Sequence, residues 1–249
     1  MDRARLAPSP RRAASAVAAD ARLAGLTGRP MCGRYYFFTP ADIVAERFGL
    51  GSRPPLRPRF NIAPQSEASV ILAGEGIRRL VAMRWGLVPS WSKDPASAYK
   101  MINARAETAP EKPSFRTPFR RQRLLVPADG FYEWKRKGET KRPFALRLAS
   151  KEPFAMAGLW DRWKKPDGSE LLSFTILTTS ANPLVSSVHD RMPVILPREA
   201  EAVWLDPTES ESALKTLLVP YAGEMEAMPI GNSVNNPRND GPELLEPVS

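Results

Sequence analysis

Two short motifs contain the only cysteine and the only histidine of the chain. Cys32 lies in Met31-Cys32-Gly33-Arg34-Tyr35, directly after an internal methionine. If translation starts at Met31, removal of that methionine leaves Cys32 with a free α-amine and a thiol on one carbon skeleton. An α-amine has a pKa of about 8 and a thiol is strongly nucleophilic, so this pair can form an imine with an aldehyde and close it to a five-membered thiazolidine.

Two other interpretations of Cys32 stay open at this point. An internal cysteine is most often a small buried apolar residue. An N-terminal cysteine can also attack a peptide bond, which is the chemistry of an autopeptidase. The motif alone does not decide between aldehyde capture, peptide cleavage and packing.

The histidine motif is His189-Asp190-Arg191-Met192-Pro193. The ordinary pKa of histidine lies between about 5 and 8, so His189 is the natural acid/base candidate. Asp190 and Arg191 follow it directly and can fix the orientation and the charge of its ring. A structural histidine is the alternative.

An acidic residue, Glu133, lies among aromatic residues in Gly130-Phe131-Tyr132-Glu133-Trp134. In a strand of this kind we expect the carboxyl group to be partly desolvated, which favours its protonated form and suits it to proton transfer. The alternative is a surface carboxylate paired with Lys135 or Arg136.

Two further segments offer residues that can contact a nucleic acid. Asn103 and Arg105 are two positions apart in an extended segment, so they point to one face, where an amide and a guanidinium can hold a sugar and a phosphate. The segment Trp85-Gly86-Leu87-Val88-Pro89-Ser90-Trp91 offers Trp85, Trp91 and Pro89 for stacking on bases or insertion between them, with core packing as an equal alternative.

The charge distribution agrees with a polyanionic partner. The net charge is +9; between Lys100 and Arg147 thirteen Lys and Arg stand against five Asp and Glu, and between Glu199 and Glu246 two stand against ten. A solvated charged surface is the alternative interpretation. One cysteine forms no internal disulfide and no thiolate zinc cluster, which favours a reducing compartment and a protein without metal or cofactor. No apolar run reaches the roughly 18–20 residues that span a bilayer.

The elements that must position these residues are short. Thr39-Pro40-Ala41-Asp42 fits a capping box and predicts a helix over 40–49 that ends near Gly49. Glycine-containing turns predict two hairpins, 70–73 with 77–85 and 154–163 with 171–178. The other predicted elements are strands at 124–126, 130–135, 144–148 and 194–196, a loop and helix over 105–121, a short helix at 182–188 and amphipathic helices at 198–205 and 210–218. Many short strands without βαβ alternation predict an α+β fold of curved, barrel-like antiparallel sheets with short peripheral helices.

Taken together and in order, six motifs resemble the SOS-response-associated peptidase (SRAP) family, whose domain senses abasic sites. They are Met31–Arg34, Arg59–Pro64, Trp85–Pro89, Ile102–Thr108, Ala128–Trp134 and His189–Pro193. The resemblance extends over nearly the whole chain after residue 30 and implies one SRAP-like domain over residues 32–249.

The resemblance also implies a function. It implies binding of single-stranded DNA and covalent capture of abasic sites by Cys32 as a thiazolidine cross-link in the DNA damage response. Asn103 is then expected to position the sugar and the cysteine amine, Glu133 to transfer the proton for imine formation, and His189 to assist ring opening of the sugar. The residues expected to contact DNA are Arg34, Asn61, Pro64, Trp85, Arg105 and Arg123. We expect a monomer that acts on DNA in the cytoplasm, at the nucleoid.

The segment before Met31 departs from this pattern. Residues 1–30 are rich in Ala, Arg and Pro, with six Arg and two Asp. While Cys32 is joined to the residue before it, its nitrogen is an amide and forms no imine. We therefore expect residues 1–31 to be a disordered extension, a removed segment or the product of a mis-assigned start, with Met31 preferred as the start. An autopeptidase that removes this segment and a non-covalent single-stranded DNA-binding module are the two alternative functions.

Overall fold

The computed structural model describes residues 33–74 and 76–248. The chain divides into the units Met1–Pro30 and Met31–Ser249, and only the second contains described residues. The expectations for residues 1–31 and for Cys32 lie outside the described residues.

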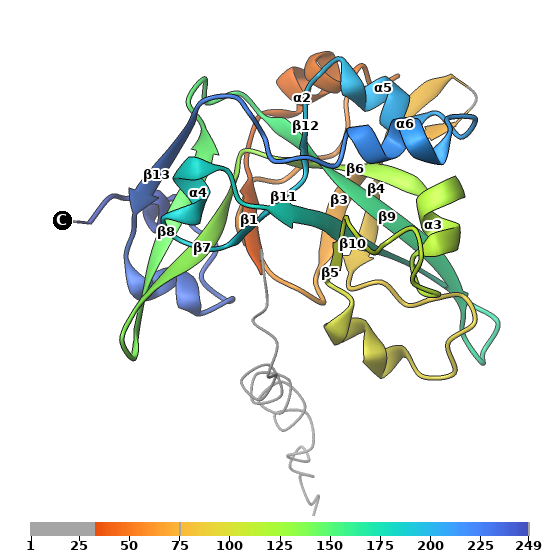
Figure 1. Cartoon of the computed structure of the whole chain (residues 1–249), viewed down its shortest axis with the longest axis horizontal. Helices are drawn as coiled ribbons and strands as arrows, with labels where there is room; N and C mark the ends of the chain where they lie inside the picture. The colour runs from red at the N-terminus through yellow and green to blue at the C-terminus, as the bar shows by residue number, and fades with distance from the viewer. Residues whose placement is uncertain (1–32, 75, 249) are drawn as a thin grey trace, which may run out of the picture. The chain divides into compact units, whose positions relative to one another are not determined.

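The described elements are mostly short strands (Figure 1). The strands are β1 (Arg34–Phe37), β2 (Arg59–Ile62), β3 (Glu67–Gly74), β4 (Ile77–Trp85), β5 (Asn103–Arg105), β6 (Arg123–Ala128), β7 (Gly130–Lys137), β8 (Thr140–Leu148), β9 (Phe154–Lys164), β10 (Glu170–Ser180), β11 (Arg191–Pro193), β12 (Ile195–Leu196) and β13 (Met225–Pro229). The helices are α2 (Ala41–Phe48), α3 (Arg116–Arg121), α4 (Pro183–Ser186), α5 (Ala200–Leu205) and α6 (Glu211–Thr216), and the 3-10 turns are η1 (Pro95–Lys100), η2 (Asn232–Asn235) and η3 (Pro242–Leu245).

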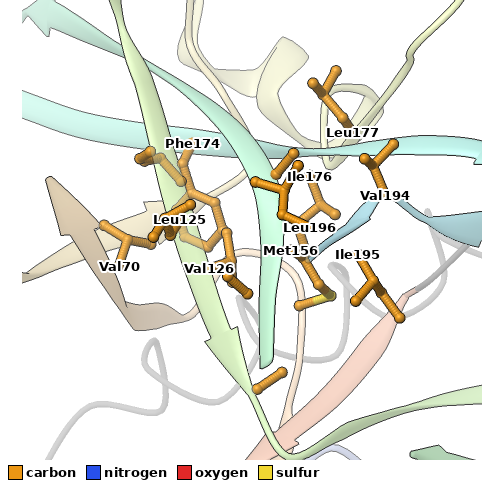
Figure 2. Packing of buried hydrophobic residues seen from close by; sticks show 14 of the residues in the cluster. Val70, Leu125, Val126, Met156, Phe174, Ile176, Leu177, Val194, Ile195 and Leu196 are labelled. Atoms are coloured by element: carbon orange, nitrogen blue, oxygen red, sulfur yellow. The ribbon is translucent and has the colours of Figure 1, made fainter. Parts of the chain in front are cut away.

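Five strands close into a barrel. β4 pairs with β3, β3 with β6, β6 with β9 and β9 with β10, all antiparallel, and β10 closes the ring by pairing in parallel with β4. Because side chains alternate along a strand, every second residue points into the barrel and must be apolar. Figure 2 shows part of the main core, where Leu125, Val126 and Met156 pack near Phe174 and Ile176.

A second sheet has the strand order β13-β8-β7-β1-β2. Its two faces are both buried. Tyr35 and Phe131 belong to the main core, whereas Tyr36 and Tyr132 pack with Val234 and other residues near the C-terminus. This double burial explains why aromatic residues follow one another in both β1 and β7.

The chain leaves the barrel between β4 and β5 and then returns to the same neighbour. β4 pairs with Ser173 and Phe174 of β10, and β5 pairs in parallel with Ile176, Leu177 and Thr178. Residues 86–102 therefore form an excursion that begins at Gly86, whose φ of 124° favours glycine, and ends where Asn103 joins β10.

The α+β, barrel-like architecture with short helices is confirmed, and so are both predicted hairpins. The sheets are not wholly antiparallel, because the 86–102 excursion lets β4 and β5 run parallel to β10. The predicted strand at 194–196 is interrupted: Val194 lies between β11 and β12 and bonds to Leu177 and Ala157.

The helix predicted over 40–49 is present as α2, and Gly49 ends it in the left-handed conformation with φ of 62°. The predicted capping box is wrong. The N-cap position is Pro40, and the Thr39 hydroxyl donates to the Asp129 carboxylate instead of capping the helix. At its other end α2 is tied to α5 by the ion pair of Arg47 with Glu201, and Figure 1 shows these two helices together at the top.

Candidate functional site

The carboxylate of Glu133 is buried beside the beginning of β1. Only 2% of Glu133 is exposed, so the alternative of a surface carboxylate paired with Lys135 or Arg136 is wrong. Glu133 shares a face of β7 with Phe131, because side chains alternate, and Phe131 lies opposite Tyr35 of β1. The carboxylate is therefore on the barrel side of the strand pair that starts at Arg34.

Trp85 connects this strand pair to Asn103. Its ring makes an edge contact with Tyr35 at 5.3 Å between centroids, and its indole N–H donates to the carbonyl of Ile102 at 2.8 Å. Trp85 is fully buried. Its assignment to the DNA-facing surface is corrected accordingly: Trp85 is a core residue that braces the backbone just before Asn103 against β1.

Asn103 and Arg105 occupy the outward positions of β5. Asn103 is partly buried and Arg105 is exposed, with buried Ala104 between them. This alternation agrees with the prediction that the two side chains point to one face. Trp85 bonds to the carbonyl of Ile102 and also contacts Tyr35. The same buried ring therefore positions both the residue before Asn103 and the strand β1.

His189 follows α4 and is held by its neighbours in the sequence. The backbone N–H of His189 donates to the Val185 carbonyl at 2.8 Å, and the side chain of Asn182 caps the helix by accepting from the Val185 N–H. The Arg191 N–H donates to Nδ1 of the ring at 3.1 Å, and the Asp190 carboxylate lies 3.0 Å from the same atom. Asp190 and Arg191 thus both contact the ring that they were expected to orient.

One ion pair joins the Asn103 segment to the His189 motif. The guanidinium of Arg191 contacts both carboxylate oxygens of Glu107, with Nη2 at 2.8 Å from Oε2, and also donates to the Thr178 carbonyl of β10 at 2.6 Å. The Arg191 hydrogen bond lowers the pKa of Glu107 below its ordinary value. The sequence indicated no role for Glu107, because no spacing rule pairs it with Arg191.

Arg34 and Asn61 are bonded to each other. Arg34 Nη1 donates to Asn61 Oδ1 at 3.0 Å and to the Val234 carbonyl at 2.9 Å. Asn61 is 1% exposed, and its amide nitrogen lies within hydrogen-bond distance of the carbonyls of Val234, Asn236 and Asn239. The direct contact of Asn61 with DNA is therefore corrected: its polar atoms face the protein, and only Arg34 is partly exposed. Pro64 lies between β2 and β3 and is also partly exposed.

The assignment of Arg123 to a DNA phosphate is also corrected. Arg123 is 5% exposed, and its guanidinium donates to the carbonyls of Phe119, Arg120, Trp204 and Asp206. Burial lowers the pKa of this arginine. Its role in the structure is to join α3, β6 and the end of α5.

Trp91, which the sequence placed beside Trp85 as a stacking candidate, is 63% exposed. Its loop is held by a hydrogen bond on each side: the Ser90 N–H donates to Asp161, and the indole of Trp163 donates to the Ser92 carbonyl. An exposed aromatic ring on a fixed loop is suited to stacking on a base.

No helix within the described residues has the length and apolar composition to cross a bilayer. Across residues 33–74 and 76–248, no three His, Cys, Asp or Glu side chains gather as a metal site. The candidate site consists of the buried carboxylate of Glu133 beside β1, the Asn103 amide on β5 and His189 after α4, with Arg34 partly exposed and Arg105 exposed.

Residues 31–237, which include all the motifs of this site, match the model of a known protein family, "SOS response associated peptidase (SRAP)". The chain belongs to the SRAP family. Among SRAP relatives, the abasic site processing protein YoqW of Bacillus subtilis (strain 168) is 46% identical over 222 residues, which cover 87% of this chain and 99% of YoqW. The abasic site processing protein HMCES of Xenopus tropicalis is 36% identical over 231 residues, covering 80% of this chain and 68% of HMCES.

The SRAP fold agrees with solved structures. A crystal structure of a protein from Bacteroides thetaiotaomicron has a TM-score of 0.79 and 30% sequence identity, and the match covers 88% of this chain and 100% of that one. A second, from Bordetella bronchiseptica, has a TM-score of 0.71 and 27% identity over 80% of this chain and 100% of that one. The predicted family and the predicted fold are thus both confirmed.

Proposed function

We propose that this SRAP protein captures abasic sites in single-stranded DNA as a covalent thiazolidine on Cys32, the first residue of the mature chain. The observation that carries the proposal is the buried carboxylate of Glu133 beside the beginning of β1, the strand that begins two residues after Cys32. Two trans peptide links limit the distance between the Cα atoms of Cys32 and Arg34 to about 7.6 Å. Relatives named abasic site processing proteins support the choice of substrate.

The reaction balances in three steps. A ring-opened abasic deoxyribose presents an aldehyde carbon, and the neutral α-amine of Cys32 adds to it. Loss of one water then gives an imine. The sulfur of Cys32 adds to the imine carbon while the thiol proton moves to the nitrogen, which closes the thiazolidine without an oxidant or reductant.

The surrounding groups have separate roles in these steps. Glu133 accepts and returns the protons of imine formation, for which a desolvated carboxyl group is suited. His189 acts as the acid that opens the sugar ring, with Asp190 beside it to stabilise the charged imidazole. Asn103 holds the sugar and the cysteine amine, and Arg34 and Arg105 meet the backbone phosphates.

Single-stranded DNA is the proposed form of the substrate, because the damaged sugar must reach a carboxylate that is almost completely buried. A stacked, paired duplex opposes this approach, whereas an unpaired strand can bend its backbone toward the site. We propose that the protein acts as a monomer on chromosomal DNA in the cytoplasm, as part of the DNA damage response.

Intact mass spectrometry tests the proposal. The protein purified from its natural source should have a mass that begins at Cys32. After mixing with a single strand that carries one abasic site, the mass should rise by that of the strand less one water. A strand with a tetrahydrofuran analogue, which has no aldehyde, should give no adduct, and Cys32→Ala should form no stable adduct with the abasic strand. Equal adduct from Cys32→Ala, or capture by protein whose Cys32 nitrogen is still in a peptide bond, would refute the proposal.

A further inference from the structure

The last residues of the chain form a strap, residues 230–248, along the second sheet. Ile230, Val234 and Leu244 of the strap pack on Tyr36 and Tyr132, on the face of β1 and β7 that points away from the barrel core. Figure 1 shows the strap at the blue end of the colour bar, beside β7 and β8. The match to the SRAP family ends at residue 237, so the last part of the strap lies beyond it.

A single carboxylate, that of Asp240, ties the end of the strap to β2. It accepts hydrogen bonds from the Phe60 N–H at 2.5 Å and the Asn61 N–H at 2.7 Å, and it forms an ion pair with Arg59. Charge-assisted bonds of this kind are among the stronger ones in proteins. The backbone of β2 at Phe60 and Asn61 is thus fixed by Asp240.

The next link runs from Asn61 to Arg34. The Asn61 side-chain nitrogen lies within hydrogen-bond distance of three strap carbonyls, those of Val234, Asn236 and Asn239. The Oδ1 atom of the same side chain accepts a hydrogen bond from Arg34. Arg34 also donates to the Val234 carbonyl of the strap itself. The direction of the Arg34 guanidinium therefore depends on the strap and on β2, both of which Asp240 holds together.

We propose that Asp240 is a positioning residue for DNA, which acts through β2 and Asn61 to direct the Arg34 guanidinium toward a backbone phosphate. This inference rests on the proposed function, in which Arg34 contacts the strand next to the captured sugar. A carboxylate at 240 is needed because three donors converge on it. An asparagine has only one acceptor oxygen, and its amide N–H groups would meet backbone N–H groups.

A purely structural role for Asp240 makes a different prediction. If Asp240 only tethers the strap, its loss lowers the free energy of unfolding and leaves the salt dependence of DNA binding unchanged. If it positions Arg34, its loss removes one phosphate contact, and the slope of log K against log salt becomes shallower by about 0.7 for a single strand.

The test measures binding of an undamaged single strand to the full chain by fluorescence anisotropy over a range of salt concentrations. We expect Asp240→Asn to weaken binding at low salt several-fold and to reduce the slope by about 0.7. Glu211→Gln is the matched control. Glu211 forms an ion pair with Arg120 on the surface, and its side chain is 33% exposed, close to the 29% of Asp240. This control should leave both quantities unchanged.

A double-mutant cycle isolates the path through Arg34. Arg34→Gln alone should reduce the slope by the same amount, and adding Asp240→Asn to it should cause no further change. An unchanged slope in folded Asp240→Asn, or an equal further loss in the Arg34→Gln background, overturns the inference. If Asp240→Asn does not fold, the same salt slopes are measured with Asp240→Glu. This variant keeps the charge and moves the carboxylate by one methylene group.

The strands in this test contain no aldehyde, so the result does not depend on covalent capture. If Cys32 formed no cross-link, the proposed function would fail while the slope of Asp240→Asn could still be measured. If cross-linking proceeded and the slope were unaffected, only the role of Asp240 would fail.

Discussion

Arg191 and Glu107 lie 84 residues apart in the sequence and form a two-point ion pair that joins the histidine motif to the segment of Asn103. Arg191 also donates to the Thr178 carbonyl of β10, the strand beside which β5 lies. The segment that begins with Asn103 and the motif of His189 are thus attached to the same strand. Glu107 thus adds a side-chain link between the two segments, beside the backbone pairing of β5 and β11 with β10.

Glu107→Gln should therefore slow covalent capture of an abasic strand while lowering the free energy of unfolding only slightly. The folded-state pKa of Glu107 lies below its unfolded value, so the stabilisation from its charge is complete above the unfolded pKa and disappears as the pH falls through the folded pKa. The melting temperatures of wild type and Glu107→Gln should differ at pH 7 and begin to converge as the pH falls below about 4. Since the Glu107 side chain is 51% exposed, the difference in unfolding free energy at pH 7 should stay below about 1 kcal/mol. A gap that widens in acid would contradict this assignment.

Glu133→Gln should separate catalysis from stability. The substitution keeps the volume of the side chain, so the protein should still fold, as checked by urea unfolding. The rate of adduct formation should fall by about 10²- to 10⁴-fold, the usual contribution of a general acid or base. The matched control is Glu226→Gln, which removes a carboxylate of β13 that pairs with Arg147 on the surface and should not change the rate.

Trp85→Phe should lower both the stability of the protein and the rate of adduct formation. It removes the indole donor from the buried carbonyl of Ile102, which keeps its hydrogen bond from the Ile176 N–H, so the lost bond costs about 0.5–1.5 kcal/mol. Asn103 is the next residue, so adduct formation should also slow, as measured in single-turnover reactions with saturating DNA. A variant that is destabilised but reacts at the wild-type rate would show that the brace is unnecessary for the site.

Arg123 and Arg105 should give opposite results. Arg123→Gln leaves several buried carbonyls without their charged donor and should lower the unfolding free energy by at least about 2 kcal/mol, with the salt slope of DNA binding unchanged. Arg105 is exposed, so Arg105→Gln should keep stability within about 0.5 kcal/mol and reduce the salt slope by about 0.7. Urea unfolding measures the stability of both variants, and anisotropy titrations measure their salt slopes. A shallower slope for Arg123→Gln together with an unchanged slope for Arg105→Gln would overturn the two assignments.

Trp91→Ala should weaken binding of an undamaged single strand by about 5- to 150-fold, which corresponds to the about 1–3 kcal/mol of one stacked base. Its stability should change little, since the ring is mostly exposed. Ile43→Ala on α2 also removes a large exposed apolar side chain, and it should leave DNA affinity unchanged. Equal losses from the two variants would indicate a general effect of surface composition.

Local signals in the sequence were sufficient for much of the fold. The glycine turn before Ile77 predicted the β3–β4 hairpin, and Gly49 marked the end of α2, because turns and helix ends depend on the conformations that single residues allow. The capping box failed for the opposite reason. Thr39 bonds to Asp129, a distant residue that no local rule includes.

The sequence by itself determined the family and the α+β class and supplied the candidate site residues, since these depend on residue types in order. Tertiary structure decided which of several residues of the same type are exposed and can contact a ligand. Trp85 and Trp91, or Arg123 and Arg105, are alike in type, yet one of each pair is enclosed and the other exposed. Burial is set by which distant strands close around a residue, and only the closure of β10 against β4 and β9, with the strap over the second sheet, fixes that.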